Sequence, residues 1–173
     1  MSTSARELHP LVSHLSLTQR GWDRLDLADV VKGALARRRD QAVEQGINIA
    51  EHLTPAVTAG DPKLLESLVT NLIDNAIRYN HAGGHVEVTT RTSGTQAVLR
   101  VTNSGPVVPG DQIPRLFHPF QRLAPDRHGR RDSYGLGLAI VNAVVRAHHA
   151  TLTANARAEG GLDIDIWFGS QSA

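Results

Sequence analysis

The chain has 173 residues, of which 40% are hydrophobic and only 4% aromatic, so we expect one compact domain with an aliphatic core. A formal net charge of +1 excludes a strongly basic surface for nucleic acid or membrane, and the absence of cysteine excludes disulfides and thiolate chemistry. No apolar run is long enough to cross a bilayer, and the N-terminus lacks the apolar stretch of a signal peptide. We therefore expect a soluble cytoplasmic protein.

The N-terminal third of the chain predicts two helical segments and one strand. Apolar residues within 1–20 recur at roughly helical spacing, which is typical of a helix fragment that needs a partner. An amphipathic helix follows over 26–46, with Asp26 as its N-cap and Gly46 as its stop signal. Residues 47–53 alternate between apolar and polar side chains, which favours a strand.

The remaining elements are two helices and two hairpins. One helix spans 61–80, with Asp61 as N-cap and Pro62 at its first position, and another spans 135–149. Between them, 104–134 is rich in glycine, proline and charge and contains one short predicted helix; a loop of this length is usually functional or disordered. Alternating segments predict two antiparallel hairpins: 85–91 with 96–103, and 150–157 with 162–168.

This order of elements predicts the fold class. Three helices can pack on one face of a mixed five-stranded sheet, because each has one apolar face to bury. We therefore expect an α+β fold in the form of a two-layer α/β sandwich.

The stretch NLIDNAIRYN, residues 71–80, carries polar side chains at helical spacing beside apolar ones. One face of the predicted helix holds Asn71, Asn75, Arg78 and Tyr79. Amide oxygens are hard ligands that suit Mg²⁺ shared with substrate phosphates, and a guanidinium suits a phosphate. The alternative is a solvated helix face with capping residues, and this stretch alone leaves both interpretations open.

Three further stretches are each weak signals when taken singly. In NSGPV, the strand that ends at Asn103 runs into a turn at Gly105, where the backbone can approach a planar ligand. In LFHPF, Phe117 and Phe120 lie in a predicted loop, and the alternative to a functional role is that they anchor this loop to the core. In SYGLGLAIV, two glycines beginning at Gly135 open an apolar helix, whose bare N–H groups attract phosphate.

Together and in this order, the four stretches resemble the N, G1, F and G2 boxes of the catalytic, ATP-binding domain of sensor histidine kinases, within the GHKL superfamily. The resemblance covers roughly residues 25–168. It implies a Bergerat-type α/β sandwich, in agreement with the element order, and it implies ATP and Mg²⁺ as cofactors. Arg127, Arg130 and Arg131 could then face the triphosphate from a lid, although a solvated loop is the alternative for each.

The resemblance implies a role for each polar residue of the N box. Asn75 would coordinate the Mg²⁺ that bridges the ATP phosphates, and Asn71 would support the metal and phosphate end. Arg78 and Tyr79 would line the phosphate and ribose side. At the start of the G2-box helix, the phosphates would be cradled by Gly135, Leu136, Gly137 and Leu138.

The G1 box departs from the family pattern at two positions. Asn103 stands where the family usually has an Asp that binds the adenine amino group, and Gly105 would let the backbone reach the base. Val107 stands where the family has a second glycine in the G1 box. Just past the F box, Arg122 would reach the γ-phosphate. Because an amide accepts without charge assistance, a degenerate nucleotide-binding pseudokinase or docking module is the alternative function.

Two features bear on the reaction and on its partners. Asn71 stands where hydrolysing members of the superfamily carry Glu, so the resemblance implies phosphoryl transfer to a protein rather than ATP hydrolysis. Neither His9 nor His14 has room for the helical hairpin that follows a phosphoacceptor histidine. We therefore expect 1–24 to be the tail of a dimerisation helix or a linker, and 25–173 to be the catalytic domain, a monomer by itself. It would phosphorylate a histidine on a dimerisation domain of the same parent kinase or of a separate chain, and a response regulator would then accept the phosphoryl group.

Overall fold

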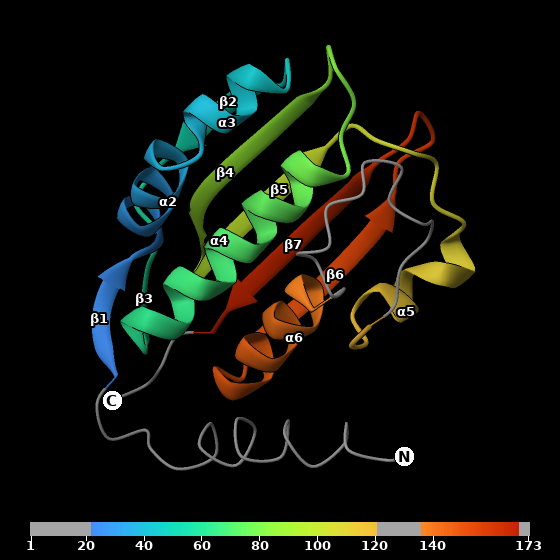
Figure 1. Cartoon of the computed structure of the whole chain (residues 1–173). Coiled ribbons are helices and arrows are strands. Elements are labelled where there is room, and N and C mark those ends of the chain that lie inside the picture. The colour runs from blue at the N-terminus through green and yellow to red at the C-terminus, as the bar shows by residue number, and fades with distance from the viewer. Residues whose placement is uncertain (1–21, 121–135, 170–173) are drawn as a thin grey trace, which may run out of the picture.

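The computed structural model describes residues 22–120 and 136–169. Within them, a β-sheet forms one layer and helices cover one of its faces, with α4 (Pro62–Arg78, green) and α6 (Gly137–Ala147, orange) lying over the sheet in Figure 1. The predicted two-layer α+β sandwich is confirmed. Among the helices of the described ranges, none is long and apolar enough to span a membrane.

The main sheet has five strands in the order β2-β4-β5-β7-β6. Their bounds are β2 (Asn48–Leu53), β4 (His85–Ser93), β5 (Gln96–Asn103), β6 (Thr151–Ala156) and β7 (Leu162–Phe168). β2 and β4 run parallel because α4 carries the chain back over the sheet between them, and the other neighbouring pairs are antiparallel. The mixed five-stranded sheet and both predicted hairpins, β4–β5 and β6–β7, are confirmed.

The helices begin largely where the sequence predicted. Asp61 caps α4 by accepting the N–H of Leu64 at 3.0 Å. The predicted helix over 26–46 is instead two helices, and its interruption holds Arg38, whose guanidinium pairs with both carboxylate oxygens of Asp74 in α4. This charge-assisted contact offsets the lost helical hydrogen bonds. The remaining helical elements are α2 (Leu27–Ala36), α3 (Arg39–Glu44), the short 3₁₀ turn η1 (Gly110–Gln112) and α5 (Ile113–Leu116).

A second, two-stranded sheet was not predicted. β1 (Asp23–Asp26) pairs antiparallel with β3 (Val57–Gly60) and ties the start of the described chain to the residues just before α4. Asp26, the predicted N-cap of α2, closes this ribbon: one of its carboxylate oxygens accepts both the N–H of Ala28 at 3.0 Å and that of Ala56 at 2.8 Å. Strands of four residues show too few alternations to be recognised in a sequence.

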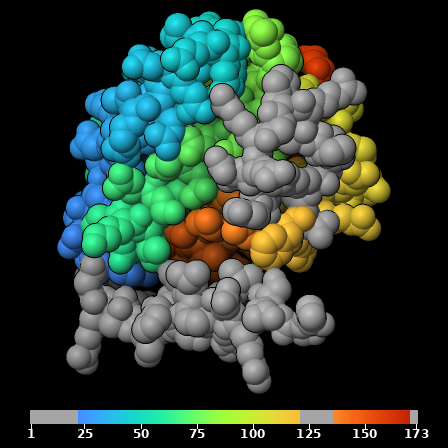
Figure 2. Space-filling view, viewed as in Figure 1, coloured from blue at the N-terminus to red at the C-terminus, as the bar shows by residue number. Residues whose placement is uncertain are grey.

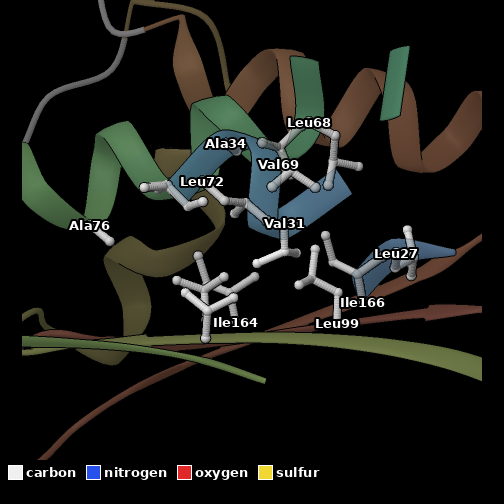
Figure 3. Close-up of a cluster of buried hydrophobic side chains, with 14 of the residues drawn as sticks. Leu27, Val31, Ala34, Leu68, Val69, Leu72, Ala76, Leu99, Ile164 and Ile166 are labelled. Carbon is white, nitrogen blue, oxygen red and sulfur yellow. The ribbon is translucent and has the colours of Figure 1, made fainter. Parts of the chain in front are cut away.

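The core lies between the helices and the sheet, as the cluster in Figure 3 shows. It is aliphatic, as the composition predicted, with Phe168 the one aromatic side chain among the largest fully buried residues of the described ranges. Helices α2 and α4 supply one side of the cluster and strands β5 and β7 the other. The labelled members are Leu27, Val31, Ala34, Leu68, Val69, Leu72, Ala76, Leu99, Ile164 and Ile166.

Candidate functional site

Helix α4 presents the N-box residues on the side that faces α6. Asn71 and Asn75 are half-buried, whereas Arg78 and Tyr79 are exposed at the C-terminal end of the helix. The Asn71 amide donates to the backbone oxygen of Ser67 at 2.8 Å, which leaves its Oδ1 free to accept. The side chain of Asn75 makes no hydrogen bond to any other described residue, so its amide is available to a ligand.

The start of α6 lies directly beside this face. A Cβ built on Gly137 would sit 3.4 Å from Asn71 Oδ1, within van der Waals contact, so the two residues are neighbours. Leu138 is buried and contributes only its backbone to the surface, while Leu136 is half-buried and its carbonyl accepts the N–H of Ile140 at 2.9 Å. The structure therefore joins the N box to the G2 box, two segments far apart in the sequence.

The G1 turn closes on the C-terminal end of α4. Asn103 ends β5, is 5% exposed, and donates its amide N–H to the backbone oxygen of Ser104 at 2.9 Å. A Cβ on Gly105 would lie 2.7 Å from the carbonyl oxygen of Tyr79, so only glycine fits between the turn and the helix. Val107, in contrast, is 68% exposed and makes a large apolar side chain available next to the turn.

Asn80 and Ser104 join the N box to the G1 turn, a connection that the sequence did not predict. Asn80 Oδ1 accepts the Ser104 hydroxyl at 2.7 Å, and its amide donates to the carbonyl of His85 at 2.9 Å. The Ser104 hydroxyl in turn accepts the N–H of His85 at 2.8 Å. A Cβ on Gly84 would lie 1.9 Å from Asn80 Oδ1, so the second glycine of the Gly83-Gly84 pair was the available sequence signal.

The β6–β7 turn supports the G1 turn from the other side. Gly161 has φ +88° and donates its N–H to the carbonyl of Pro106 at 2.9 Å. A Cβ on Gly161 would lie 1.8 Å from the carbonyl oxygen of Asn103, and Arg157 donates to that same oxygen at 3.3 Å. The backbone of Asn103 is therefore held by β7 and by Arg157. The hydrogen bond to Ser104 fixes the direction of the Asn103 side chain.

The remaining predicted site residues are placed differently. Phe117 is half-buried and packs against the core, as expected for a loop anchor, while Phe120 is 53% exposed with φ +66°. The predicted site residues Arg122 and Gly135 lie outside the described ranges, as do Arg127, Arg130, Arg131, His9 and His14. Figure 2 shows that α4 (green), α6 (orange) and the segment containing α5 (yellow) reach the same face of the molecule.

A shallow cavity of about 430 Å³ lies elsewhere, on the sheet face that carries no helices. Two of its arginines pair with the same lining carboxylate: Arg100 lies 3.5 Å and Arg157 lies 3.9 Å from Asp163. No described residue of the four motifs lines this cavity, so the motif residues rather than the cavity define the candidate site.

The donor set of the site fits Mg²⁺ shared with phosphates. Within the described ranges, no group of three His, Cys, Asp or Glu side chains could hold a metal ion. The amide oxygens of Asn75 and Asn71 accept no hydrogen bond from the described part of the chain and are hard donors, and Mg²⁺ usually takes one or two protein oxygens and completes its shell with water and phosphate. The site is therefore suited to a metal that arrives with a nucleotide.

Comparison with known proteins gives the same assignment. The sensor protein CutS of Streptomyces coelicolor is 44% identical over 139 residues, which are 80% of this chain and 34% of that protein. The sensor histidine kinase CusS of Escherichia coli K12 is 32% identical over 136 residues, 79% of this chain and 28% of that protein. The chain thus spans about a third of the length of these curated relatives.

Solved structures show the same fold. The mycobacterial sensor histidine kinase MprB superposes with a TM-score of 0.75 at 28% identity, covering 88% of this chain and all of that one. The catalytic domain of histidine kinase ThkA superposes with a TM-score of 0.75 at 18% identity, covering 87% of this chain and 96% of that one, a likeness of fold alone. Residues 60–171 match the family model described as histidine kinase-, DNA gyrase B- and HSP90-like ATPase. With the N, G1 and G2 boxes gathered at one face of this sandwich, the chain belongs to that ATPase family, in the form found in the catalytic domains of sensor histidine kinases.

Proposed function

We propose that this chain binds Mg²⁺-ATP and transfers the γ-phosphoryl group to a histidine on a dimerisation domain, as the catalytic half of a two-component system in the cytoplasm. The observation that carries the proposal is the contact between Asn71 and Gly137, which sets the free N-box amides against the glycine start of α6. The two relatives are named as a sensor protein and as a sensor histidine kinase, and these names support the same reaction.

The phosphate end of the site rests on α4 and on the start of α6. Asn75 would hold Mg²⁺, which when bound neutralises phosphate charge, and Asn71 would support the same end through its free Oδ1. Arg78 and Tyr79, both exposed, would line the phosphate and ribose side. The backbone of 135–138 would cradle the phosphates, and Arg122 would reach the γ-phosphate.

The base end of the site rests on the G1 turn. Because the Asn103 amide N–H is bonded to the carbonyl of Ser104, its Oδ1 is the atom left to accept a hydrogen bond, and the adenine amino group is a donor. This orientation supports adenine binding by Asn103 in place of the usual carboxylate. Gly105 would let the backbone approach the base, and Val107 would cover it with an apolar side chain.

The chemistry at Asn71 favours transfer over hydrolysis. An amide cannot take a proton from water, so no side chain at this position activates a water molecule for attack. The chain's residues would position the triphosphate and neutralise its charge, and the acceptor imidazole would attack in line. Residues 1–24 would be the tail of a dimerisation helix or a linker, and a response regulator would receive the phosphoryl group.

The test begins with calorimetric titration of ATP and ADP into the purified chain with Mg²⁺. We expect binding that is lost on adding EDTA and in Asn75→Ala, whereas Asn155→Ala, at an exposed position on β6, should bind as the parent does. No binding at millimolar nucleotide would overturn the proposal. Equal binding by Asn75→Ala would remove Asn75 from the metal site.

Transfer is tested separately with ATP labelled at the γ-phosphate and dimerisation domains of histidine kinases. We expect an acid-labile, alkali-stable phosphoryl label on the acceptor histidine. ATP binding without any transfer would leave a nucleotide-binding docking module, the alternative function that Val107 and Asn103 suggest. Steady phosphate release without a protein acceptor would instead indicate an ATP hydrolase.

A further inference from the structure

His148, directly after α6, is buried and uses both of its ring nitrogens. It is 2% exposed, its Nδ1 lies 2.8 Å from the carbonyl oxygen of Val144, and its Nε2 lies 3.1 Å from the backbone nitrogen of Asp61. A carbonyl only accepts and an N–H only donates, so the proton must be on Nδ1 and the lone pair on Nε2. The fold therefore requires the neutral ring in one tautomer.

These two contacts join the start of α4 to the end of α6. Asp61 is the N-cap of α4, and His148 is the C-cap of α6. Gly60, just before the cap, packs so closely that a Cβ there would lie 2.8 Å from His148 Cδ2. One side chain thus holds both helices that carry the proposed nucleotide residues, at the ends where those residues are not found.

The proposed nucleotide site lies at the other end of the packed pair of helices. Asn71 lies about 15 Å along α4 from Asp61, and Gly137 lies about 16 Å along α6 from His148, at 1.5 Å per residue. The two helices lie side by side in Figure 1, run in opposite directions and contact each other extensively. Because they pack as one unit, a shift at the His148 end can be transmitted along the shared interface to Gly137 and Asn71.

The incoming chain reaches the same point. The Trp22 ring stacks on the His148 ring with centroids 5.1 Å apart and planes at 14°, while Phe168 of β7 meets it edge-on at 6.4 Å. The next residue, Asp23, pairs with Gly60 in the β1–β3 ribbon. Trp22 and Asp23 therefore both lie at the junction of α4 and α6.

We propose that His148 is a positioning residue for nucleotide binding: it holds the start of α4 to the end of α6, and Trp22 supports it by stacking on its ring. This inference rests on the proposed ATP-binding function. It predicts that changes at either aromatic ring alter nucleotide affinity at a site about 15 Å away.

Protonation of His148 supplies the specific test. A proton on Nε2 would replace the acceptor of the Asp61 N–H by a second donor, which breaks the contact with α4. Burial lowers the pKa of His148 and the charge of His149 lowers it further, whereas the hydrogen bond to Val144 and the Asp61 carboxylate raise it. Among the described residues, Gly60 and the rings of Trp22 and Phe168 also pack against the imidazole, and none of them carries a charge.

The experiment measures the Kd for Mg²⁺-ATP from pH 7.5 to 5.5 in the parent chain and in His148→Gln. Dividing the two Kd values at each pH cancels the protonation of the nucleotide and of every other histidine. We expect His148→Gln to bind about fivefold more weakly at pH 7.5, and the ratio to decrease as the pH drops toward the lowered pKa of the His148 ring. His149→Asn is the matched control for the affinity at pH 7.5, because His149 is exposed, lies next in the chain, and has φ +51°, which Asn tolerates.

Trp22→Ala gives a second variant that leaves the core side chains in place, since Trp22 is only half-buried. Opening one face of the imidazole to water should move the His148 titration toward higher pH and should weaken ATP binding. The titration is followed by NMR through the ring-proton signal that is missing from the spectrum of His148→Gln. A Kd ratio near one at every pH, or a Trp22→Ala chain with unchanged affinity, overturns the inference while the ATP site stands. A parent chain that binds no ATP overturns the proposed function and this inference together.

Discussion

Asn80→Ala should remove the connection between the N box and the G1 turn. The Asn80 side chain makes four hydrogen bonds, to the backbone of Ala76, His81 and His85 and to the Ser104 hydroxyl. Each is worth about 0.5–1.5 kcal/mol net, and the position is half-buried, so we expect a loss of about 2–4 kcal/mol of unfolding free energy. Nucleotide affinity should fall as well, because Ser104 would no longer hold the G1 turn to α4.

Equilibrium urea unfolding, followed by circular dichroism, measures the first effect. With a slope of about 2 kcal/mol per M, typical of a small protein, the midpoint should fall by about 1–2 M at unchanged slope. Asn155→Ala is the matched control: Asn155 is exposed on β6, and its replacement should change stability by less than about 0.5 kcal/mol. If the midpoint of Asn80→Ala shifts no further than that of the control, the hydrogen bonds around Asn80 do not hold the two motifs together.

Three more predictions follow from single contacts. Gly161→Ala should lower the free energy of unfolding in urea by more than about 2 kcal/mol, because its Cβ would lie 1.8 Å from a carbonyl oxygen. The control Gly94→Ala, at a position with φ +60° and open space, should lose only about 1–2 kcal/mol. Equal losses in the two variants would argue against the clash. Asp26→Ala should lose about 2–4 kcal/mol of unfolding free energy, since it removes the cap of α2 and leaves the N–H of the fully buried Ala56 unpaired. Asp26→Asn, measured by the same assay, should retain most of the unfolding free energy. Because the pKa of His148 is lowered in the folded chain, the unfolded chain binds the extra proton first as the pH drops. The free energy of unfolding should therefore decrease below pH 6.5 and level off below the folded pKa. A parent stability curve that matches the curve of His148→Gln throughout this range would contradict this prediction.

The elements that the sequence predicted are those whose signals are local. Asp61 with Pro62 marks the start of α4 within a few residues, and Gly94 lies in the turn that separates β4 from β5. The two elements that differ depend on distant partners: the break at Arg38 faces Asp74, and β1 exists only through its pairing with β3. Tertiary contacts of this kind override local patterns, and a single sequence does not reveal them.

The site divides in the same way. The box residues were recognisable because each motif is a short run with its own chemistry, and the structure places Asn71, Gly137 and Asn103 where such motifs would meet. The roles assigned to them remain predictions. What the sequence could not supply were the connections, since Asn80 meets Ser104 and Asp61 meets His148 only after the chain has folded.

The order of strands in the sheet has a consequence for how the site forms during folding. β4–β5 and β6–β7 are hairpins that need only short loops to close, whereas the β5–β7 pairing joins residues about 60 positions apart, such as Asn103 and Leu162. The G1 turn and Gly161 meet at that long-range junction. Closing a long loop carries an entropy cost that local pairing does not, so amide protons of the two hairpins should gain protection from exchange before those between β5 and β7. We therefore expect the base end of the proposed site to form late in folding, after both hairpins have closed.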